Sequence, residues 1–157
     1  MDFMSDRLAT RKRFRTLNVL DITSRECVEI AAARSFSSDW VMDCLDTRIG
    51  EHGKPAGVQV DNGTEFTSNP FGAWAYGRGV AVHFITPDQP TENGVVESFN
   101  GKLRDECLNA NWFDTLDDTR SLIESWRTDY NEQQPHSALG NIPPAQYVAN
   151  LMGWASP

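Results

Sequence analysis

The apolar residues of this chain fall into short runs, and the order of these runs limits the possible fold more than any other feature. In the first 33 residues the runs have the length of strands, at residues 1–8, 14–22 and 27–33. Segment 14–22 alternates imperfectly between apolar and polar residues, and an Arg-Lys-Arg turn at 11–13 precedes it. Strands so close in sequence are joined by tight turns, which predicts an antiparallel three-strand meander.

After residue 33, strand-length and helix-length segments alternate. Ser37 or Ser38 can cap the first helix, and Pro70 suits the first turn of the second, where its missing N–H is not needed. The predicted helices cover residues 37–49, 69–77, 95–109 and 116–131, and the later predicted strands cover residues 56–60 and 81–85. Strands that alternate with helices favour parallel pairing. The sequence therefore predicts an α/β fold with a five-stranded mixed sheet, the antiparallel meander plus parallel strands, flanked by helices.

Composition restricts the class of protein. The 157 residues suit one domain with a hydrophobic core. No apolar run approaches the ~20 residues that a membrane-spanning helix needs, and no apolar segment follows the N-terminal charges as it would in a signal peptide. The three cysteines are far apart and form no CxxC pair, which argues against a structural zinc site. We therefore expect a cytoplasmic protein with ordinary thiols and no membrane partner.

The net charge of −8 is unevenly distributed along the chain. The first 20 residues carry five basic and two acidic side chains, so the remainder is strongly acidic. An acidic surface disfavours nucleic acid, whose binding depends on basic side chains. Carboxylates that hold divalent cations can still attract phosphate groups, however, because the bound ions make the local field positive. The charge alone therefore does not exclude a nucleic-acid partner.

Two carboxylates stand where a site can form. Asp61 follows a predicted strand and precedes an Asn-Gly pair, and Glu97 lies near the start of a predicted helix. Both positions also have ordinary interpretations, because Asp-Asn-Gly is a common turn and an acid near a helix N-terminus is favoured by the helix dipole. Acids occupy 22 of the 157 positions, so one occurs at any chosen spacing about one time in seven. The separation of these two acids alone therefore decides little.

A site for two Mg²⁺ ions needs a third acid, and Asp2 or Asp21 on neighbouring predicted strands can provide it. Magnesium takes oxygen ligands, and paired ions can activate the attacking oxygen and stabilise the leaving one in phosphodiester chemistry. The chain contains no GxSxG nucleophile motif and no Walker loop. Metal-assisted phosphoryl transfer is therefore the chemistry that the carboxylates favour.

Five blocks of sequence carry a resemblance to a known family. They are MDFMSD at residues 1–6, LNVLDITSRE at 17–26, DNGTEF at 61–66, PTENGVVESFNGKLRDECL at 90–108 and YNEQQPHSALGNIPPAQY at 130–147. With these blocks the chain resembles the integrase catalytic core of bacterial insertion-sequence transposases, which share an acidic triad with retroviral integrases. The match covers nearly the whole chain, and several blocks in the same order are far more specific than any single motif.

The resemblance implies an RNase H-like fold and an Asp-Asp-Glu triad. The family's first acid matches Asp2 in MDFM, the second matches Asp61 in DNG, and the third matches Glu97 in VVESFNG. Asp61 and Glu97 are separated by 35 residues, which is the separation that the family shows between its second and third acids. All three would be catalytic as ligands of Mg²⁺, for which Mn²⁺ can substitute. Asp21 matches a frequent family position outside the triad, so it ranks below Asp2.

The implied function is Mg-dependent DNA strand cleavage and strand transfer during transposition and DNA integration. The expected partners are DNA, as element ends and target, and other copies of the chain, in a nucleoid-associated cytoplasmic protein. Lys102 and Arg104 would contact DNA phosphate, with solvated surface charge as the alternative. Asn62 and Asn93 would position DNA or metal ligands.

The resemblance also implies a domain division. The catalytic core would cover residues 1–133, and residues 134–157 would form its C-terminal tail. The helix-turn-helix region that the family carries upstream is expected to be absent.

The chain also departs from the family's usual residues. Gln89 stands where a lysine is usual, Glu92 where a glutamine is usual, and Gln134 where an arginine is usual, and each lost phosphate contact weakens DNA binding. The family's first strand begins several residues earlier than Asp2, and a ligand so near a terminus is liable to fray. Two alternatives therefore stay open: a truncated, catalytically inactive transposase remnant that acts at most as an interaction module, and an RNase H-like nuclease without strand transfer.

Overall fold

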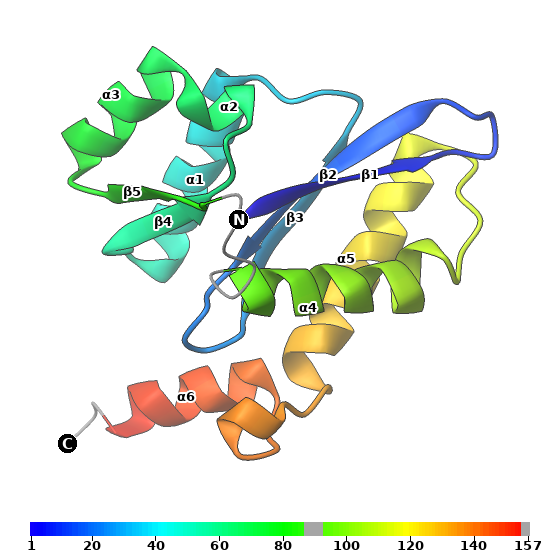
Figure 1. Ribbon diagram of the computed structural model, residues 1–157. Coiled ribbons are helices and arrows are strands. Elements are labelled where there is room, and N and C mark those ends of the chain that lie inside the picture. The colour runs from blue at the N-terminus through cyan, green and yellow to red at the C-terminus, as the bar shows by residue number, and fades with distance from the viewer. Residues whose placement is uncertain (87–92, 155–157) are drawn as a thin grey trace.

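The computed structural model describes residues 1–86 and 93–154, so positions 89 and 92 lie outside the described residues (Figure 1). The strands are β1 (Asp2–Arg7), β2 (Arg13–Leu20), β3 (Cys27–Ala33), β4 (Gly57–Val60) and β5 (Ala81–Phe84). The α-helices are α1 (Ser38–His52), α2 (Thr64–Thr67), α3 (Asn69–Arg78), α4 (Gly94–Leu103), α5 (Leu116–Glu132) and α6 (Pro144–Trp154). A π-helix, η2 (Arg104–Leu108), continues α4, and a 3₁₀-helix, η3 (Ser137–Leu139), precedes α6. The α/β class is therefore as predicted.

The first three strands form the predicted antiparallel meander in the order β1-β2-β3. Asp2 lies opposite Asn18 in this sheet, and the register between β2 and β3 shifts at Val19/Leu20. Strands β4 and β5 pair in parallel, with Gly57 opposite Ala81. Both kinds of pairing that the sequence predicts are therefore present.

The prediction of one five-stranded sheet is wrong, because the five described strands lie in two sheets of three and two strands. The two sheets meet where the amino group of Met1 donates a hydrogen bond to the Gln59 carbonyl at 2.7 Å. Figure 1 shows the N-terminus at this junction, with β1 running away from β4. A parallel ladder needs several evenly spaced hydrogen bonds, and the described strands β1 and β4 form no such ladder with each other.

The predicted serine cap of α1 is present, and α3 has a serine cap that was not predicted. The Ser37 side chain accepts a hydrogen bond from the Trp40 N–H at 3.1 Å and so begins α1. Ser68 caps α3 in the same way through the Phe71 N–H at 3.3 Å. The left-handed Gly79, with φ of 65°, ends α3.

The predicted helix over 95–109 is α-helical only in its first part. At Arg104 the chain changes to the π-helix η2, which ends with a hydrogen bond of 2.8 Å from the Asn109 N–H to the Arg104 carbonyl. The wider turn accommodates one more residue. As a result, the adjacent residues Cys107 and Leu108 are both buried. Helices α2 and α6 were not predicted; α6 lies within residues 134–157.

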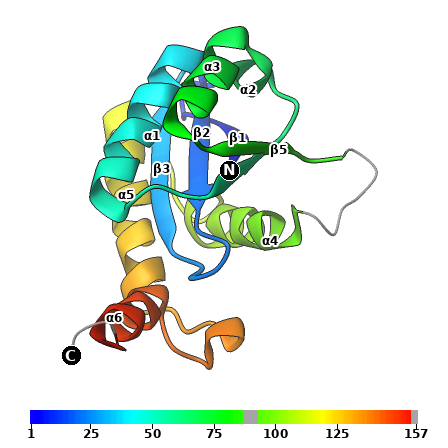
Figure 2. The ribbon, with the colours of Figure 1, turned by 90° about the vertical axis from the view of Figure 1, so that its left-hand side faces the viewer.

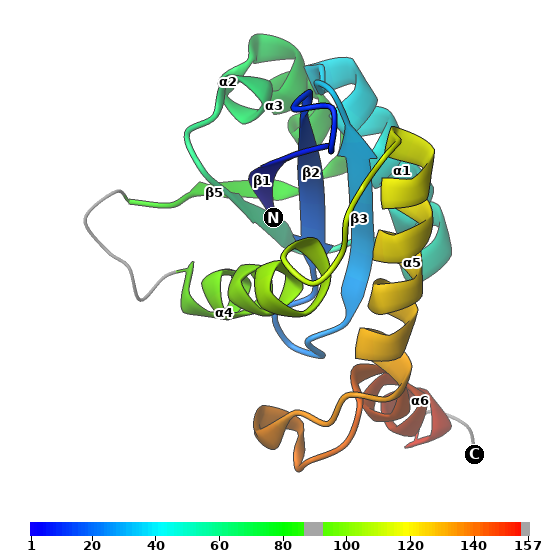
Figure 3. The same ribbon diagram turned by 90° about the vertical axis from the view of Figure 1, so that its right-hand side faces the viewer.

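The meander is buried on both faces. Phe14 of β2 packs with Leu103 and Ile123 from α4 and α5, whereas Leu17 of β2 packs with Val41 and other residues of α1, β4 and α3. Figure 3 shows α5 along β3, and Figure 2 shows α6 at the far end of α5. No helix within residues 1–86 and 93–154 has the length and apolar character needed to cross a bilayer.

Candidate active site

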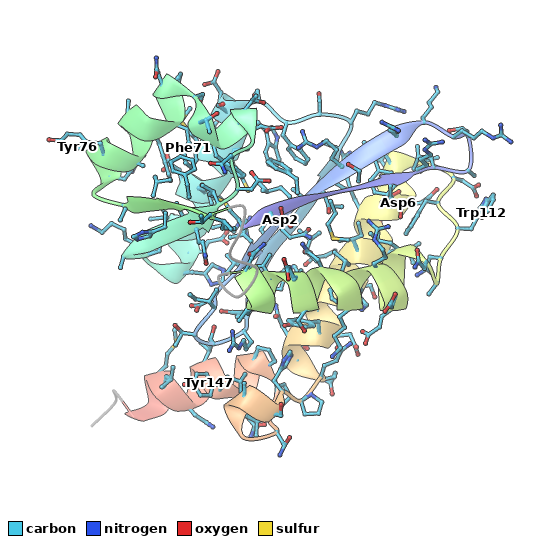
Figure 4. All side chains as sticks on the ribbon, in the orientation of Figure 1. Asp2, Asp6, Phe71, Tyr76, Trp112 and Tyr147 are labelled. Atoms are coloured by element: carbon cyan, nitrogen blue, oxygen red, sulfur yellow. The ribbon has the colours of Figure 1, made fainter. Side chains whose placement is uncertain are left out.

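Asp2 lies half-buried on β1, beside α4 (Figure 4). Its Oδ1 accepts a hydrogen bond from the Phe3 N–H at 2.8 Å, and its Oδ2 accepts one from Nδ2 of Asn100 on α4 at 2.7 Å. Oδ1 of Asn100 in turn accepts a hydrogen bond from Nδ2 of the fully buried Asn18 on β2 at 2.8 Å. Two asparagines therefore fix the orientation of the Asp2 carboxylate.

The charge of Asp61 acts on both Asp2 and the amino group of Met1. Burial raises the pKa of Asp2, and the charge of Asp61 raises it further, against the hydrogen bonds from Phe3 and Asn100. Burial also lowers the pKa of the Met1 amino group, while the charges of Asp2 and Asp61 oppose that effect. Two carboxylates and one amino group therefore share the junction between the sheets.

Asp61 follows β4 and begins a turn that its own side chain closes. Its Oδ1 accepts a hydrogen bond from the Gly63 N–H at 2.8 Å. A Cβ at residue 63 would lie 2.8 Å from this oxygen and 3.2 Å from Oε2 of Glu65, so a larger residue would displace the Asp61 carboxylate from this position. Glu65 itself forms an ion pair with Arg15 of β2. The turn interpretation of Asp-Asn-Gly is therefore correct, and the turn also aims the carboxylate.

Glu97 is exposed in the first turn of α4. Three and seven residues later on the same side of the helix, Asn100 contacts Asp2 and Arg104 contacts Ser5 and Asp6 of β1. Helix α4 therefore runs along β1. Three residues span about 4.5 Å along a helix axis. Glu97 therefore lies about 4.5 Å from Asn100 along α4, toward the N-terminal end of the helix.

The charge of Asp61 acts on Asp2, but Glu97 does not complete a metal-binding cluster with them among the residues that the structure describes. Within the described ranges, no three His, Cys, Asp or Glu side chains are grouped closely enough to hold a metal ion. The ligand type nevertheless fits a hard divalent cation, which prefers carboxylate oxygen. Such an ion would also relieve the repulsion by which Asp61 raises the pKa of Asp2. The three-residue metal site stays a prediction.

The two predicted basic contacts lie on different sides of α4 and its continuation. Arg104 donates from Nη2 to the Ser5 carbonyl at 3.1 Å, and its Nη1 lies 3.8 Å from Asp6. Nζ of Lys102 instead lies 5.8 Å from the centre of the Tyr130 ring. Arg104 therefore holds α4 against β1, whereas Lys102 faces α5.

The two predicted asparagines flank the junction. Nδ2 of Asn62 donates to the Ile85 carbonyl at 3.4 Å and ties the end of β4 to the end of β5. Asn93 precedes α4 without a side-chain cap, and its Oδ1 is buried without a hydrogen-bond partner among the described residues. These contacts do not test a role in DNA binding.

Sequence reasoning missed the contribution of Asn18 and Asn100. The signal was present, because a polar residue inside the apolar strand FRTLNVL needs a buried partner. Asp21, the lower-ranked acid, is exposed and accepts hydrogen bonds from the Thr23 and Ser24 N–H groups at 2.7 and 3.2 Å. It therefore holds the turn between β2 and β3.

Gln134, which stands where the family usually has an arginine, lies beside two acids. Its Nε2 donates to Glu106 at 3.1 Å and to Asp129 at 3.0 Å. The position therefore faces carboxylates of the chain itself. The expectation that this glutamine weakens DNA binding stays a prediction.

The sequence matches a known family. Residues 1–90 match the family described as Integrase core domain, and residues 78–144 match a second family with the same description. The 39.2 kDa protein of insertion element IS476 from Xanthomonas euvesicatoria is 47% identical over 150 residues, which are 96% of this chain and 43% of that protein.

Two further relatives also come from insertion elements. The 31.7 kDa protein of IS407 from Burkholderia multivorans is 44% identical over 149 residues, which are 95% of this chain and 54% of that protein. The transposase for IS904 from Lactococcus lactis is 27% identical over 131 residues, covering 82% of this chain and 52% of the relative. The chain thus spans about half the length of these proteins.

Solved structures share the fold. A chain of the simian T-cell lymphotropic virus intasome, in complex with a PP2A regulatory subunit, has a TM-score of 0.77 at 18% identity, covering 93% of this chain and 51% of that one. The HTLV-2 integrase catalytic core in complex with magnesium, in its trimeric form, has a TM-score of 0.66 at 16% identity. The match covers 93% of this chain and 94% of that chain. These similarities confirm the predicted RNase H-like architecture. With a family match over residues 1–90 and relatives in insertion elements, the chain belongs to the integrase core domain family.

Proposed function

We propose that this chain is the catalytic core of an insertion-element transposase that cleaves and joins DNA strands by metal-dependent phosphoryl transfer. The observation that carries the proposal is the hydrogen bond from Met1 to the Gln59 carbonyl, which brings the start of β1, with Asp2, to the end of β4, with Asp61, in a chain of the integrase core domain family. Each carboxylate is oriented before any ligand arrives, Asp2 by Asn100 and Asp61 by the Gly63 N–H. Such preorganisation favours catalysis because the site needs little rearrangement.

The metal ligands in this proposal are Asp2, Asp61 and Glu97, and the ion is Mg²⁺, for which Mn²⁺ can substitute. Divalent ions held there would activate the attacking oxygen and stabilise the leaving oxygen. A structural neighbour, the HTLV-2 core, is in complex with magnesium. Glu97 is exposed, so its side chain can change rotamer without disturbing the core. Asn18 and Asn100 would keep the Asp2 carboxylate in one orientation.

DNA is the proposed substrate, with Lys102, Arg104, Asn62 and Asn93 as its contacts around the carboxylates. Arg104 contacts Ser5 and Asp6, so a phosphate that lies along β1 would be within its reach. We also propose that the core covers residues 1–133, with 134–157 as its tail, and that the active form is an oligomer.

Cleavage of DNA by this chain tests the proposal. A supercoiled plasmid that carries the element ends should be nicked with Mg²⁺ or Mn²⁺, and Asp61→Asn should abolish the nicking. Asp21→Asn is the matched control, because it removes a charge from an exposed acid that only holds a turn. Nicking that survives the double change Asp61→Asn and Glu97→Gln would refute the assignment of these ligands.

Two further readouts separate the alternatives. Calorimetry with Mn²⁺ should show heat of binding for the chain as given and a weaker signal for Asp61→Asn. Absence of Mn²⁺ binding would favour an inactive interaction module. Cleavage of an RNA–DNA hybrid without nicking of DNA would favour an RNase H-like nuclease.

A further inference from the structure

A small pocket lies beside α4, on the side that faces α5. It has a volume of about 280 Å³ and is bounded by the turn between β2 and β3, by α4, by α5 and by the start of η3. Its polar lining comes from Arg25, Ser98, Lys102, Tyr130, His136 and Ser137. None of the described residues that line it is acidic.

Two nitrogen atoms near this pocket are buried and unpaired. Nη1 of Arg25 and Nε2 of His136 have no hydrogen-bond partner among the residues that the structure describes. Buried polar atoms are nearly always paired, so an unpaired guanidinium nitrogen calls for an acceptor. An oxyanion in the pocket would supply it, since Arg and anion oxygens form strong charge-assisted hydrogen bonds.

Tyr130 contacts the basic residues around this space. Its hydroxyl donates to the Arg25 carbonyl at 3.1 Å, and the ring centre of His136 lies 4.9 Å from its own. Nζ of Lys102 lies 5.8 Å from the Tyr130 ring. Arg25 sits in a left-handed conformation, with φ of 61°, at the turn between β2 and β3. One buried aromatic side chain therefore contacts all three basic residues.

The electrostatics around His136 are positive. Burial lowers the pKa of His136, and the charges of Lys102 and Arg25 lower it further. One acid approaches the cluster: Oε1 of Glu106 lies 4.0 Å from Nζ of Lys102, one turn further along the helix. Glu106 also accepts hydrogen bonds from Trp126 and Gln134, which occupy its Oε2. Arg25 has no such carboxylate partner among the described ion pairs.

We propose that this pocket binds a phosphate group, with Arg25 and Lys102 as cationic contacts and His136 and Ser98 as hydrogen-bonding groups. Ser98 adjoins Glu97 in sequence, and Gly94 and Val95 of the first turn of α4 also line the pocket. The pocket therefore extends along α4 from before Glu97 to Lys102. That the phosphate belongs to a DNA strand rests on the proposed function; free phosphate is the other source of the same chemistry. Lys102 thus binds DNA away from β1, where Arg104 lies.

Inorganic phosphate is the direct probe of this pocket. The chain has three histidines, so the imidazole signals of His136 in NMR spectra can be assigned with His136→Gln. Phosphate should shift the His136 signals saturably, without a saturable shift at His52 and His83. Arg25→Gln should weaken phosphate binding about tenfold or more, because a charge-assisted hydrogen bond is lost. Absence of a saturable shift would overturn the proposal.

Two further variants separate the specific role of Arg25 from a general loss of positive charge. Arg34→Gln, at an exposed arginine that follows β3, is the matched control and should leave phosphate binding unchanged. Arg25→Lys keeps the charge at the left-handed position and should retain part of the affinity. Equal phosphate binding by Arg25→Gln and by Arg34→Gln would overturn the assignment of Arg25.

A DNA arm identifies the source of the phosphate. Fluorescence anisotropy with a labelled duplex, without metal, should show weaker binding by Arg25→Gln across sequences. The slope of log affinity against log salt should also decrease by about 0.9 for one lost phosphate contact. An unchanged slope, with the phosphate titration intact, would overturn DNA as the source. Failure of DNA nicking by the parent chain would refute the proposed function. The phosphate titration would still test the pocket, because it measures binding and does not depend on DNA cleavage.

Discussion

Substitution of Asn100 tests how the Asp2 carboxylate is held. Asn100→Ala removes the 2.7 Å hydrogen bond to Oδ2 of Asp2 and the acceptor of the 2.8 Å hydrogen bond from Asn18. Asn18 is fully buried, so its amide would be left without a partner, at a cost of about 1–3 kcal/mol. Asp2 is only half-buried, and water can replace part of its lost bond, so we assign about 1 kcal/mol to it. We expect the free energy of unfolding to fall by about 2–4 kcal/mol.

The same variant has an electrostatic signature. The hydrogen bond from Asn100 lowers the pKa of Asp2, so its loss should raise that pKa further above the ordinary value. Urea unfolding gives the change in stability, and carboxyl ¹³C NMR titration gives the pKa. Asn150→Ala, at an exposed position of α6, is the matched control and should stay within about 0.5 kcal/mol of the parent. Unchanged stability together with an unchanged Asp2 pKa would refute the role of Asn100.

Three other substitutions probe the surroundings of the site. Gly63→Ala places a Cβ 2.8 Å from Oδ1 of Asp61, and we expect Mn²⁺ affinity by calorimetry to fall about 10–100-fold. Arg15→Ala removes the ion pair with Glu65, and we expect a loss of about 1 kcal/mol in urea unfolding at neutral pH. Burial alone would raise the pKa of Glu65, but the Arg15 hydrogen bond and other contacts lower it overall. The stability from this pair is therefore present above the ordinary glutamate pKa of about 4.3, and the gap between parent and variant should close as the pH falls below it. Thr115→Ala removes the capping box of α5 and should lower stability by about 1 kcal/mol.

Two of these predictions have a control variant in the chain, and the third has a control in its pH dependence. Gly72→Ala adds a Cβ with no atom within 4 Å and should leave Mn²⁺ affinity unchanged. Equal affinities for the two alanine variants would refute the close approach at residue 63. Thr128→Ala, exposed within α5, should cost less than Thr115→Ala. A stability gap for Arg15→Ala that stays constant from pH 7 to pH 3 would show that Glu65 is not the partner that matters.

Local patterns in the sequence predict much of the fold. β3 begins at Cys27 and ends at Ala33 as the apolar run indicates, because strand propensity and alternation are local properties. Ser37 caps α1 for the same reason: the hydrogen bond joins residues three apart. The turn at Asp61 is equally local, since Oδ1 bonds to the N–H of the residue two positions on.

The features that sequence reasoning missed depend on contacts between distant residues. The bond from Asn18 to Asn100 joins positions 82 apart, and no local pattern specifies it. The division into two sheets depends on how far β1 reaches along β4, which only tertiary contacts determine. The change to a π-helix at Arg104 depends on the fit of Cys107 and Leu108 into the core. The family resemblance placed Asp2 and Asp61 together, whereas composition and spacing alone left Asp2 and Asp21 as alternatives.

The most direct test of the central claim is anomalous diffraction from crystals of this chain grown with Mn²⁺. The account predicts an anomalous peak between the carboxylates of Asp2 and Asp61, with Glu97 turned toward the ion and Asn100 still bonded to Asp2. The peak should be lost in crystals of Asp61→Asn and retained in crystals of Asp21→Asn. No peak at this position at saturating Mn²⁺, or a peak that persists in Asp61→Asn, would contradict the claim that these carboxylates form the metal site.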